Sequence, residues 1–287
     1  MSNTKRVRKD SGFWREFKKN KGAMVGLVVI ILIILIALCA GFIVDYDTDV
    51  IAMNSAERLQ PPSAEHWFGT DPYGRDIFAR ILYATRPSLA VGIMAVVIAL
   101  AIGSTLGVIA GYYGGAIENI IMRTSDVFIS IPSILLAICI ASSLGQGLSV
   151  LMIAIGIVSC ASFTRIARAA VLPIRGQEFI EAAISSGARD YQIILHHVIP
   201  NCLAPIIVQA TMRVASAIIL AASLSFLGLG IPAPDPEWGG MLSEGRNFIR
   251  DSSYLTLIPG AAIVVTVLSI NLLGDGLRDA MDPKLRS

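Results

Sequence analysis

The sequence of 287 residues has little charge: Asp, Glu, Lys and Arg together make up 15% of it, whereas 54% of its residues are hydrophobic. Soluble globular domains have about 25% charged residues, so this composition excludes an ordinary soluble domain and indicates an integral membrane protein surrounded by lipid. The net charge of +2 gives no reason to expect nucleic acid as a partner.

Cysteine is scarce, and the common catalytic motifs are missing. The four cysteines have no CxxC or Cys/His spacing, which argues against a disulfide framework and against a metal site: Cys39, Cys139, Cys160 and Cys202. No Gly-Lys dipeptide occurs, so the chain lacks a P-loop for nucleotide phosphates, and HExxH is absent too. These absences predict a protein that is not an enzyme and binds no cofactor of its own.

Long uncharged runs dominate the sequence instead. A helix needs about 20 apolar residues to cross a bilayer. Runs of this kind cover residues 24–44, 88–111, 127–164, 214–234 and 252–274. The third run is too long for one span, and the turn-forming stretch "SSLGQGLS" (142–149) predicts a hairpin within it. The fold class is therefore all-α, with six transmembrane helices.

Basic residues are distributed unevenly between the two sides of such a six-span protein. With both termini on one side, 17 of the 23 Lys and Arg residues, Arg213 among them, fall on the side of the termini. Asp and Glu divide almost equally. The positive-inside rule therefore predicts cytoplasmic termini. We divide the chain into an N-terminal cytoplasmic segment (1–23), a membrane domain (24–274) with a cytoplasmic loop at about 165–205, and a C-terminal cytoplasmic tail (275–287).

The cytoplasmic loop contains the stretch "EAAISSGARDYQIILHHVIPN" (181–201). Gly187 is expected to end one short helix, because glycine is common just after a helix C-terminus. Asp190 is expected to cap a second helix, and Pro200 to close it. The small Ala182 and Ala183 would let another backbone approach closely. The residues alone leave two interpretations open, a docking element for a partner protein or a solvated loop.

The order and spacing of six residues in this loop resemble the "EAA" loop of ATP-binding-cassette (ABC) importer permeases: Glu181, Ala182, Ala183, Gly187, Ile199 and Pro200. In that family the loop forms coupling helices that fit into a cleft of the cytoplasmic ATPase subunit. The resemblance therefore implies that these six residues couple the chain to an ATPase. His197 departs from the family pattern, in which Ile is common, and we expect it to tune the contact.

Three further stretches are similar to the dipeptide, oligopeptide and nickel group of these permeases, and to its "C"-type subunit. They are "FGTDPYGRDIFARILYATRPSL" (68–89), "SLSFLGLGIPAPDPEWGGML" (223–242) and "NLLGDGLRDAMDPKLR" (271–286). The chain departs from the group at Ala79, Ala84 and Ala233, where Ser, Gly and Pro are usual. Together with the loop, the motifs extend over most of the chain.

The resemblance implies a type I importer fold in the bacterial inner membrane. The chain would form half of a translocation pore for short peptides, beside a related B-type permease. Two cytoplasmic ATPase subunits would bind ATP and Mg²⁺ and hydrolyse the ATP, and an extracytoplasmic binding protein would deliver the peptide. Nickel or another small solute is the alternative cargo. A stand-alone secondary transporter is less favoured, because the middle of each predicted span carries no charge. Residues that contact the substrate are not predicted.

Two other groups of residues have more than one interpretation. Arg123 and Asp126 lie three positions apart at the start of the third predicted span, where they could pair with each other. The resemblance implies an inner gate at these two residues, and the sequence does not separate the two roles.

His196 and His197 are adjacent, so they point to different faces of a helix, and no carboxylate or thiol is spaced to complete a metal site.

The predicted outer loop, residues 45–87, carries five notable charges: Asp71, Arg75, Asp76, Arg80 and Arg86. They could contact the binding protein or pair internally. Since Asp76 and Arg80 lie four residues apart in an amphipathic stretch, we expect those two to form an ion pair.

Overall fold

The computed structural model describes residues 10–281, so the outer parts of the predicted N-terminal segment and C-terminal tail lie outside the described residues. The described chain is helical and contains no β-strand. Its α-helices are α1 (Asp10–Lys19), α2 (Lys21–Ile43), α3 (Ile77–Tyr113), α4 (Gly115–Ser130), α5 (Ser133–Leu144), α6 (Leu148–Arg175), α7 (Glu178–Ser185), α8 (Asp190–Ile193), α9 (Ile199–Phe226), α10 (Trp238–Gly245) and α11 (Tyr254–Met281). The all-α prediction is confirmed.

Five helical segments are long and apolar enough to cross a membrane: α2, α3, α6, the continuous run Asp190–Phe226, and α11. A sixth span is obtained if α4 and α5 are counted as one, although they are bent by 92° at their junction. Pro132 causes this break, because proline has no N–H to donate and holds the preceding Ile131 in an extended conformation.

The boundaries of three predicted spans differ from the observed helices. The third span begins at Gly115 rather than at residue 127, and the predicted hairpin within 142–149 is confirmed between α5 and α6. The predicted span 214–234 is wrong at both ends, because α9 begins at Ile199 and ends at Phe226. The amphipathic stretch before residue 88 is the beginning of α3, which therefore has 37 residues.

The helices α3 and α6 pack against each other more extensively than any other pair. Gly103, Gly107 and Gly111 lie at intervals of four on α3 and place its backbone directly against α6. A Cβ atom added at Gly107 would lie 2.3 Å from the carbonyl oxygen of Thr164 and 2.7 Å from the Cβ of Ala167. This close approach excludes any side chain larger than hydrogen on that face of α3.

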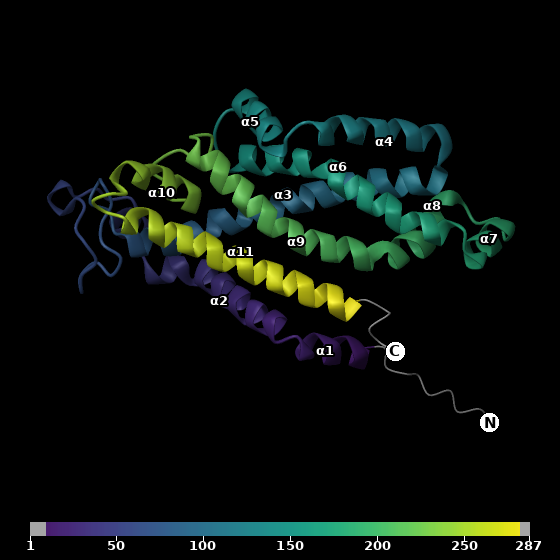
Figure 1. Cartoon of the computed structure of the whole chain (residues 1–287), viewed down its shortest axis with the longest axis horizontal. Helices are drawn as coiled ribbons and strands as arrows, with labels where there is room; N and C mark the ends of the chain where they lie inside the picture. Colours follow the sequence, from purple (N-terminus) through teal and green to yellow (C-terminus); the bar gives the residue numbers. More distant parts are fainter. Residues whose placement is uncertain (1–9, 282–287) are drawn as a thin grey trace.

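The two ends of the helix bundle differ (Figure 1). At one end lie α7, α8, α1 and the last turn of α11, while α10 and the long connection between α2 and α3 lie at the other. Helix α2 runs beside α11. Phe17 of α1, Ala23 of α2 and Ala280 of α11 form a small buried cluster. The segment resembling the coupling loop therefore lies at the same end of the bundle as α1 and the C-terminal end of α11.

Candidate functional site

The first half of the loop is a helix that ends in a tight turn. Gly187, with φ +78°, follows the last residues of α7 and adopts the left-handed conformation that glycine favours. The N–H of Gly187 donates to the carbonyl oxygen of Ile184 (2.9 Å), and that of Ala188 donates to the carbonyl oxygen of Ala183 (3.1 Å). These two bonds satisfy carbonyl groups at the helix end. The prediction that Gly187 terminates the first helix is confirmed.

The second half of the loop differs from its prediction. Asp190 is not a helix cap: its carboxylate accepts a hydrogen bond of 3.0 Å from the Tyr112 hydroxyl group of α3, and Arg189 occupies the N-cap position of α8. Pro200 does not close a helix either. The helix continues from α8 through a π-helical turn at Ile194–Val198 into α9. This wider turn accommodates the proline, whose missing N–H would otherwise interrupt the α-helical ladder.

Buried side chains fasten the loop to the bundle. Ile180 on α7 and Ile193 on α8 are at most 1% exposed, and they belong to one apolar cluster with Val108 and Tyr112 of α3 and Val171 of α6. Together with the Tyr112–Asp190 hydrogen bond, this cluster ties both halves of the loop to the ends of α3 and α6. The loop is therefore packed firmly against the ends of two spanning helices.

Other residues of the loop are exposed, and most of them are apolar. We define the loop surface as Phe179, Glu181, Ala182, Ile184, Tyr191 and Leu195, all of which are exposed. Ile184, Tyr191 and Leu195 are each 55% exposed. Ala183 is half-buried at its edge, and Ile199 and Pro200 lie beyond it at the start of α9. Exposed apolar residues of this kind are typical of surfaces that contact a protein or a membrane.

The two histidines of the loop have separate surroundings. Nδ1 of His196 lies 3.0 Å from the carbonyl oxygen of Gln192, one turn earlier. The ring of His197 lies 6.3 Å from that of Phe179, so it packs beside the loop surface. Across residues 10–281 the structure has no group of three or more His, Cys, Asp or Glu side chains arranged to hold a metal ion.

Asp126 lies on α4 and pairs with Arg165 of α6 at 2.6 Å. The pairing of Arg123 with Asp126, which the sequence left open beside a gating role, is not seen among the described residues, and both residues lie within α4 rather than at the start of a span. Nε of Arg168 contacts Glu118 at 2.5 Å, which forms a second link between the same two helices. The sequence could not indicate these two pairs, because Arg165 lies 39 residues from Asp126 and Arg168 lies 50 residues from Glu118.

A buried ion cluster lies at the other end of the bundle. Arg75 and Arg80 are each 1% exposed; Arg75 contacts Asp71 at 2.5 Å and Glu244 at 2.7 Å. The predicted pair between Asp76 and Arg80 is wrong, because Nε and Nη2 of Arg80 lie 3.6 and 3.5 Å from Asp71 and Glu244 instead. Separately, the guanidinium of Arg86 donates to the carbonyl oxygens of Ala37 and Leu38 on α2. These arginines therefore have carboxylate or carbonyl partners within the chain, although Nε of Arg80 makes no hydrogen bond.

Asp76 has two other roles. Its carboxylate accepts the N–H of Ala79 (2.9 Å) and so caps α3, and it also contacts Nδ1 of His66 at 2.8 Å. The hydrogen bond to Asp76 raises the pKa of His66 against the opposing effect of burial, and the negative charges of Asp76, Glu57 and Glu65 add to the rise.

Because the pKa of His66 is raised in the folded state, its contribution to stability is complete below its unfolded pKa of about 6.5 and is lost as the pH rises through the folded value. We expect a contribution on the order of 0.5 kcal/mol. The thermal midpoint of the purified protein should then fall by about 1–2 °C between mildly acidic and mildly alkaline pH. His66→Gln should remove this fall; an unchanged pH profile in the variant would contradict the assignment.

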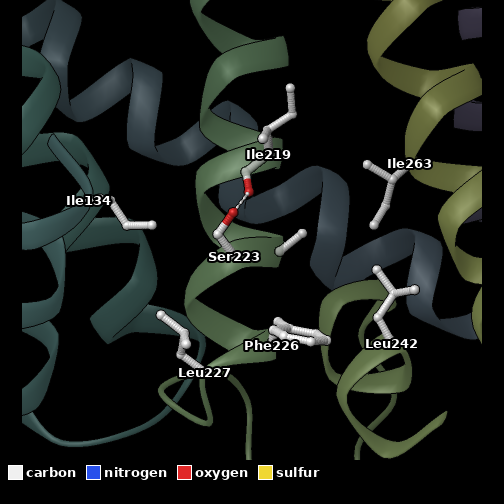
Figure 2. Close-up of a pocket in the computed structure, with 8 residues that line it drawn as sticks. Ile134, Ile219, Ser223, Phe226, Leu227, Leu242 and Ile263 are labelled. Carbon is white, nitrogen blue, oxygen red and sulfur yellow. Dashed lines mark hydrogen bonds between the residues drawn. The ribbon is translucent and has the colours of Figure 1, made fainter. Parts of the chain in front are cut away.

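Two adjoining hollows open on the face formed by α5, α6, α9, α10 and α11. One, of about 390 Å³, is apolar and is lined by residues that include Ile134, Ile219, Phe226, Leu242 and Ile263 (Figure 2). The other, of about 330 Å³, shares Ile134, Ile219 and Ser223 with the first and extends along α6 and α9. The motif at residues 223–242 contains Ser223, Phe226 and Leu242, but nothing in the sequence indicated that they line a hollow, because the lining residues come from separate helices.

Comparisons with known proteins agree with this architecture. Residues 103–287 match the family of binding-protein-dependent transport system inner membrane components, and residues 11–62 match the N-terminal transmembrane domain of oligopeptide transport permease C. The chain is 52% identical to the dipeptide transport system permease protein DppC of Alkalihalophilus pseudofirmus, over 96% of this chain and 91% of that protein. It is 45% identical to the glutathione transport system permease protein GsiD of Pectobacterium atrosepticum, with the same coverage.

A solved structure shows the same fold. The structure described as inward-facing conformations of the MetNI methionine ABC transporter superposes with a TM-score of 0.59 at 19% identity. The match covers 72% of this chain and 98% of that chain.

Proposed function

This chain belongs to the family of binding-protein-dependent transport system inner membrane components, and from that membership we propose that it forms half of the translocation pore of an ABC importer for short peptides. Relatives named for dipeptide and glutathione transport, at 52% and 45% identity over nearly the whole chain, support a peptide as the cargo. Nickel or another small solute is the less favoured cargo. A stand-alone secondary transporter does not fit the family.

The loop surface is the docking site for a cytoplasmic ATPase subunit in this proposal. The single observation that carries it is that the loop is both anchored and exposed: Ile180 and Ile193 are buried against α3 and α6, whereas Phe179, Ile184 and Tyr191 are exposed at the end of the bundle. Exposed apolar side chains on two short helices suit a groove on a partner. The exposed Glu181 beside it can pair with a basic residue of that partner.

Coupling then follows from the rigid attachment of the loop. If the ATPase holds the loop surface differently in its two states, the difference in binding free energy shifts the permease between its conformations. The displacement passes through Ile180, Ile193 and the Tyr112–Asp190 bond to α3 and α6. ATP and Mg²⁺ are bound and ATP is hydrolysed by the two ATPase subunits, while this chain binds neither.

The remaining partners and the orientation follow the same scheme. The pore is completed by a related B-type permease, and an extracytoplasmic binding protein delivers the peptide to the end of the bundle that carries α10. The loop end and both termini are cytoplasmic, in the inner membrane of a bacterium. Asp126, held by Arg165, and Arg123 on the same helix are candidates for an inner gate.

The experiment is reconstitution of this chain in proteoliposomes with its B-type permease, the ATPase subunits and the binding protein. We expect these subunits to copurify, and uptake of a labelled dipeptide to require ATP on the ATPase side and the binding protein on the other. Labelled nickel in the same vesicles tests the alternative cargo. Uptake by the chain alone, without nucleotide-binding subunits, would contradict the proposal.

A further inference from the structure

Arg213 lies halfway along α9, about 20 Å from the start of that helix. The sequence placed Arg213 on the cytoplasmic side, directly before the predicted span 214–234, and predicted spans without charge in their middle; in the structure Arg213 instead lies inside the continuous helix Asp190–Phe226. A charge at this depth is costly in a membrane and usually faces the interior of a bundle or a water-filled passage. Arg213 does so here, since it lines the groove between α5, α6 and α9.

The guanidinium group of Arg213 has no counter-ion within the described chain. No Asp or Glu among residues 10–281 lies within ion-pair distance of it, and its buried Nε has no hydrogen-bond partner. Arg165 and Arg168 on α6 show the contrast, because each pairs with a carboxylate of α4. Arg213 is half-buried, and a guanidinium whose buried Nε has no partner is costly, so its position points to a ligand that arrives from outside the chain.

Hydroxyl groups surround Arg213 in the groove. Ser133 of α5, Ser159 and Ser162 of α6, and Ser216 and Ser223 of α9 line the same hollow of about 330 Å³. The Ser223 hydroxyl donates to the carbonyl oxygen of Ile219 at 2.8 Å. Within residues 10–281 the other four serines make no hydrogen bond through their hydroxyl groups, so four donors are available beside the cation. This set of donors is complementary to an anion with several acceptor oxygens.

The neighbouring apolar hollow gives the face a second chemical character. It shares Ile134, Ile219 and Ser223 with the serine-lined groove and extends towards Phe226 and Leu242, at the end of the bundle that carries α10 (Figures 1 and 2). The face therefore passes from an apolar region near that end to a cationic, hydroxyl-lined region halfway along α9. A molecule with an apolar part and a carboxylate matches both regions.

We propose that Arg213, with Ser133, Ser159, Ser162 and Ser216, binds the carboxylate of the permeating peptide inside the pore. This inference rests on the proposed function for the identity of the cargo, and it adds a contact site within the membrane. A guanidinium group holds a carboxylate through two parallel hydrogen bonds, which an ammonium group cannot reproduce. A carboxylate of the second permease could supply the same chemistry, so the test must separate that source from the peptide.

The first experiment measures the charge preference of the groove and does not depend on the cargo. Ser216 lies one turn from Arg213 and can be replaced by cysteine in a chain whose four native cysteines are alanine. In the assembled complex, the rate of reaction with an anionic methanethiosulfonate is divided by the rate with a cationic one at each cysteine. We expect this ratio to be about fivefold higher at Ser216→Cys than at Ser143→Cys. Ser143 is exposed near the end of α5, about 15 Å along that helix from the groove.

Adding Arg213→Gln should remove the preference at Ser216→Cys and leave Ser143→Cys unchanged. The same ratio at both cysteines, or a preference that survives Arg213→Gln, would overturn the inference. If the second permease supplied the carboxylate instead, the anionic preference would be absent and Arg213→Gln would reduce copurification of that permease; either result would also overturn it.

The second experiment measures ATP-driven uptake of a dipeptide by the reconstituted complex. Arg213→Gln should lower uptake about tenfold or more, with Arg213→Lys intermediate, while the variants assemble in normal amounts. Uptake equal to wild type in Arg213→Gln would overturn the carboxylate site and leave the proposed function intact. Absence of peptide uptake by the wild-type complex would instead refute the proposed function, while the charge preference at Ser216→Cys would stand by itself.

Discussion

Replacing Gly187 by valine is expected to separate ATP hydrolysis from uptake. Gly187 has φ +78°, a conformation that is unfavourable for a residue with a Cβ atom by about 1–2 kcal/mol and worse for a β-branched one. No atom lies within 4 Å of where that Cβ would be, so the effect is on the backbone turn and not on packing. The valine would redirect α7 relative to α8 and displace the loop surface from its groove on the ATPase.

In reconstituted vesicles we expect Gly187→Val to reduce peptide uptake by at least about tenfold, a loss equivalent to about 1.4 kcal/mol of coupling free energy. ATP hydrolysis should continue, and the protein should still insert into the membrane. Gly187→Asn should restore much of the uptake, because asparagine tolerates the left-handed conformation.

The chain offers a matched control in Gly145. It also has a positive φ, +98°, and a Cβ atom added there would have no other atom within 4 Å, but it lies in the hairpin between α5 and α6. With φ +98° and ψ −150°, Gly145 adopts a conformation that is almost restricted to glycine, so Gly145→Val should impose at least as much backbone strain, without uncoupling. Full uptake by Gly187→Val, or an equal loss in Gly145→Val, would show that the turn at Gly187 does not serve coupling.

The second large effect is expected at the contact between α3 and α6. Gly107→Ala places a methyl group 2.3 Å from the carbonyl oxygen of Thr164, which is backbone and cannot rotate away. The helices must separate, and we expect destabilisation of at least about 2 kcal/mol. In detergent, the thermal midpoint should fall by about 4–8 °C, and the yield of assembled complex should fall with it.

The same substitution at Gly260 on α11 is the control. There the added methyl group would meet only the side chain of Leu242, at 3.9 Å, which is an ordinary contact. Since alanine is a better helix former than glycine, Gly260→Ala should be neutral or slightly stabilising. A midpoint for Gly107→Ala within about 1 °C of wild type would mean that α3 and α6 can move apart at little cost.

Much of the architecture was predictable because it depends on neighbouring residues. An uncharged run of about 20 residues can satisfy its backbone in lipid only as a helix, whatever surrounds it, so the spanning segments followed from composition. The turn at Gly187 and the hairpin within 142–149 followed from the local preference of glycine for positive φ. The family likeness rested on motifs that could be read directly from the chain.

The errors arose where one segment meets another. Asp190 was assigned to a cap because it precedes a helix, but Tyr112, 78 residues earlier, engages its carboxylate. Asp76 and Arg80 were paired because they are four residues apart, whereas Arg80 lies beside Asp71 and Glu244. Pro200 was expected to end a helix that a π-helical turn allows to continue.

The sequence by itself therefore determined which segments are helical and apolar, where the chain turns, and which family it resembles, because these properties depend on residues within a few positions of one another. Only the tertiary structure decided which charges are neutralised and which are not. An ion pair depends on the distance between two side chains in the folded protein. Arg75 and Glu244, for example, are 169 residues apart in the sequence and are brought into contact by folding. For the same reason Arg213 could be identified as an unpaired charge, midway through the bundle, only after α5, α6 and α9 were placed around it.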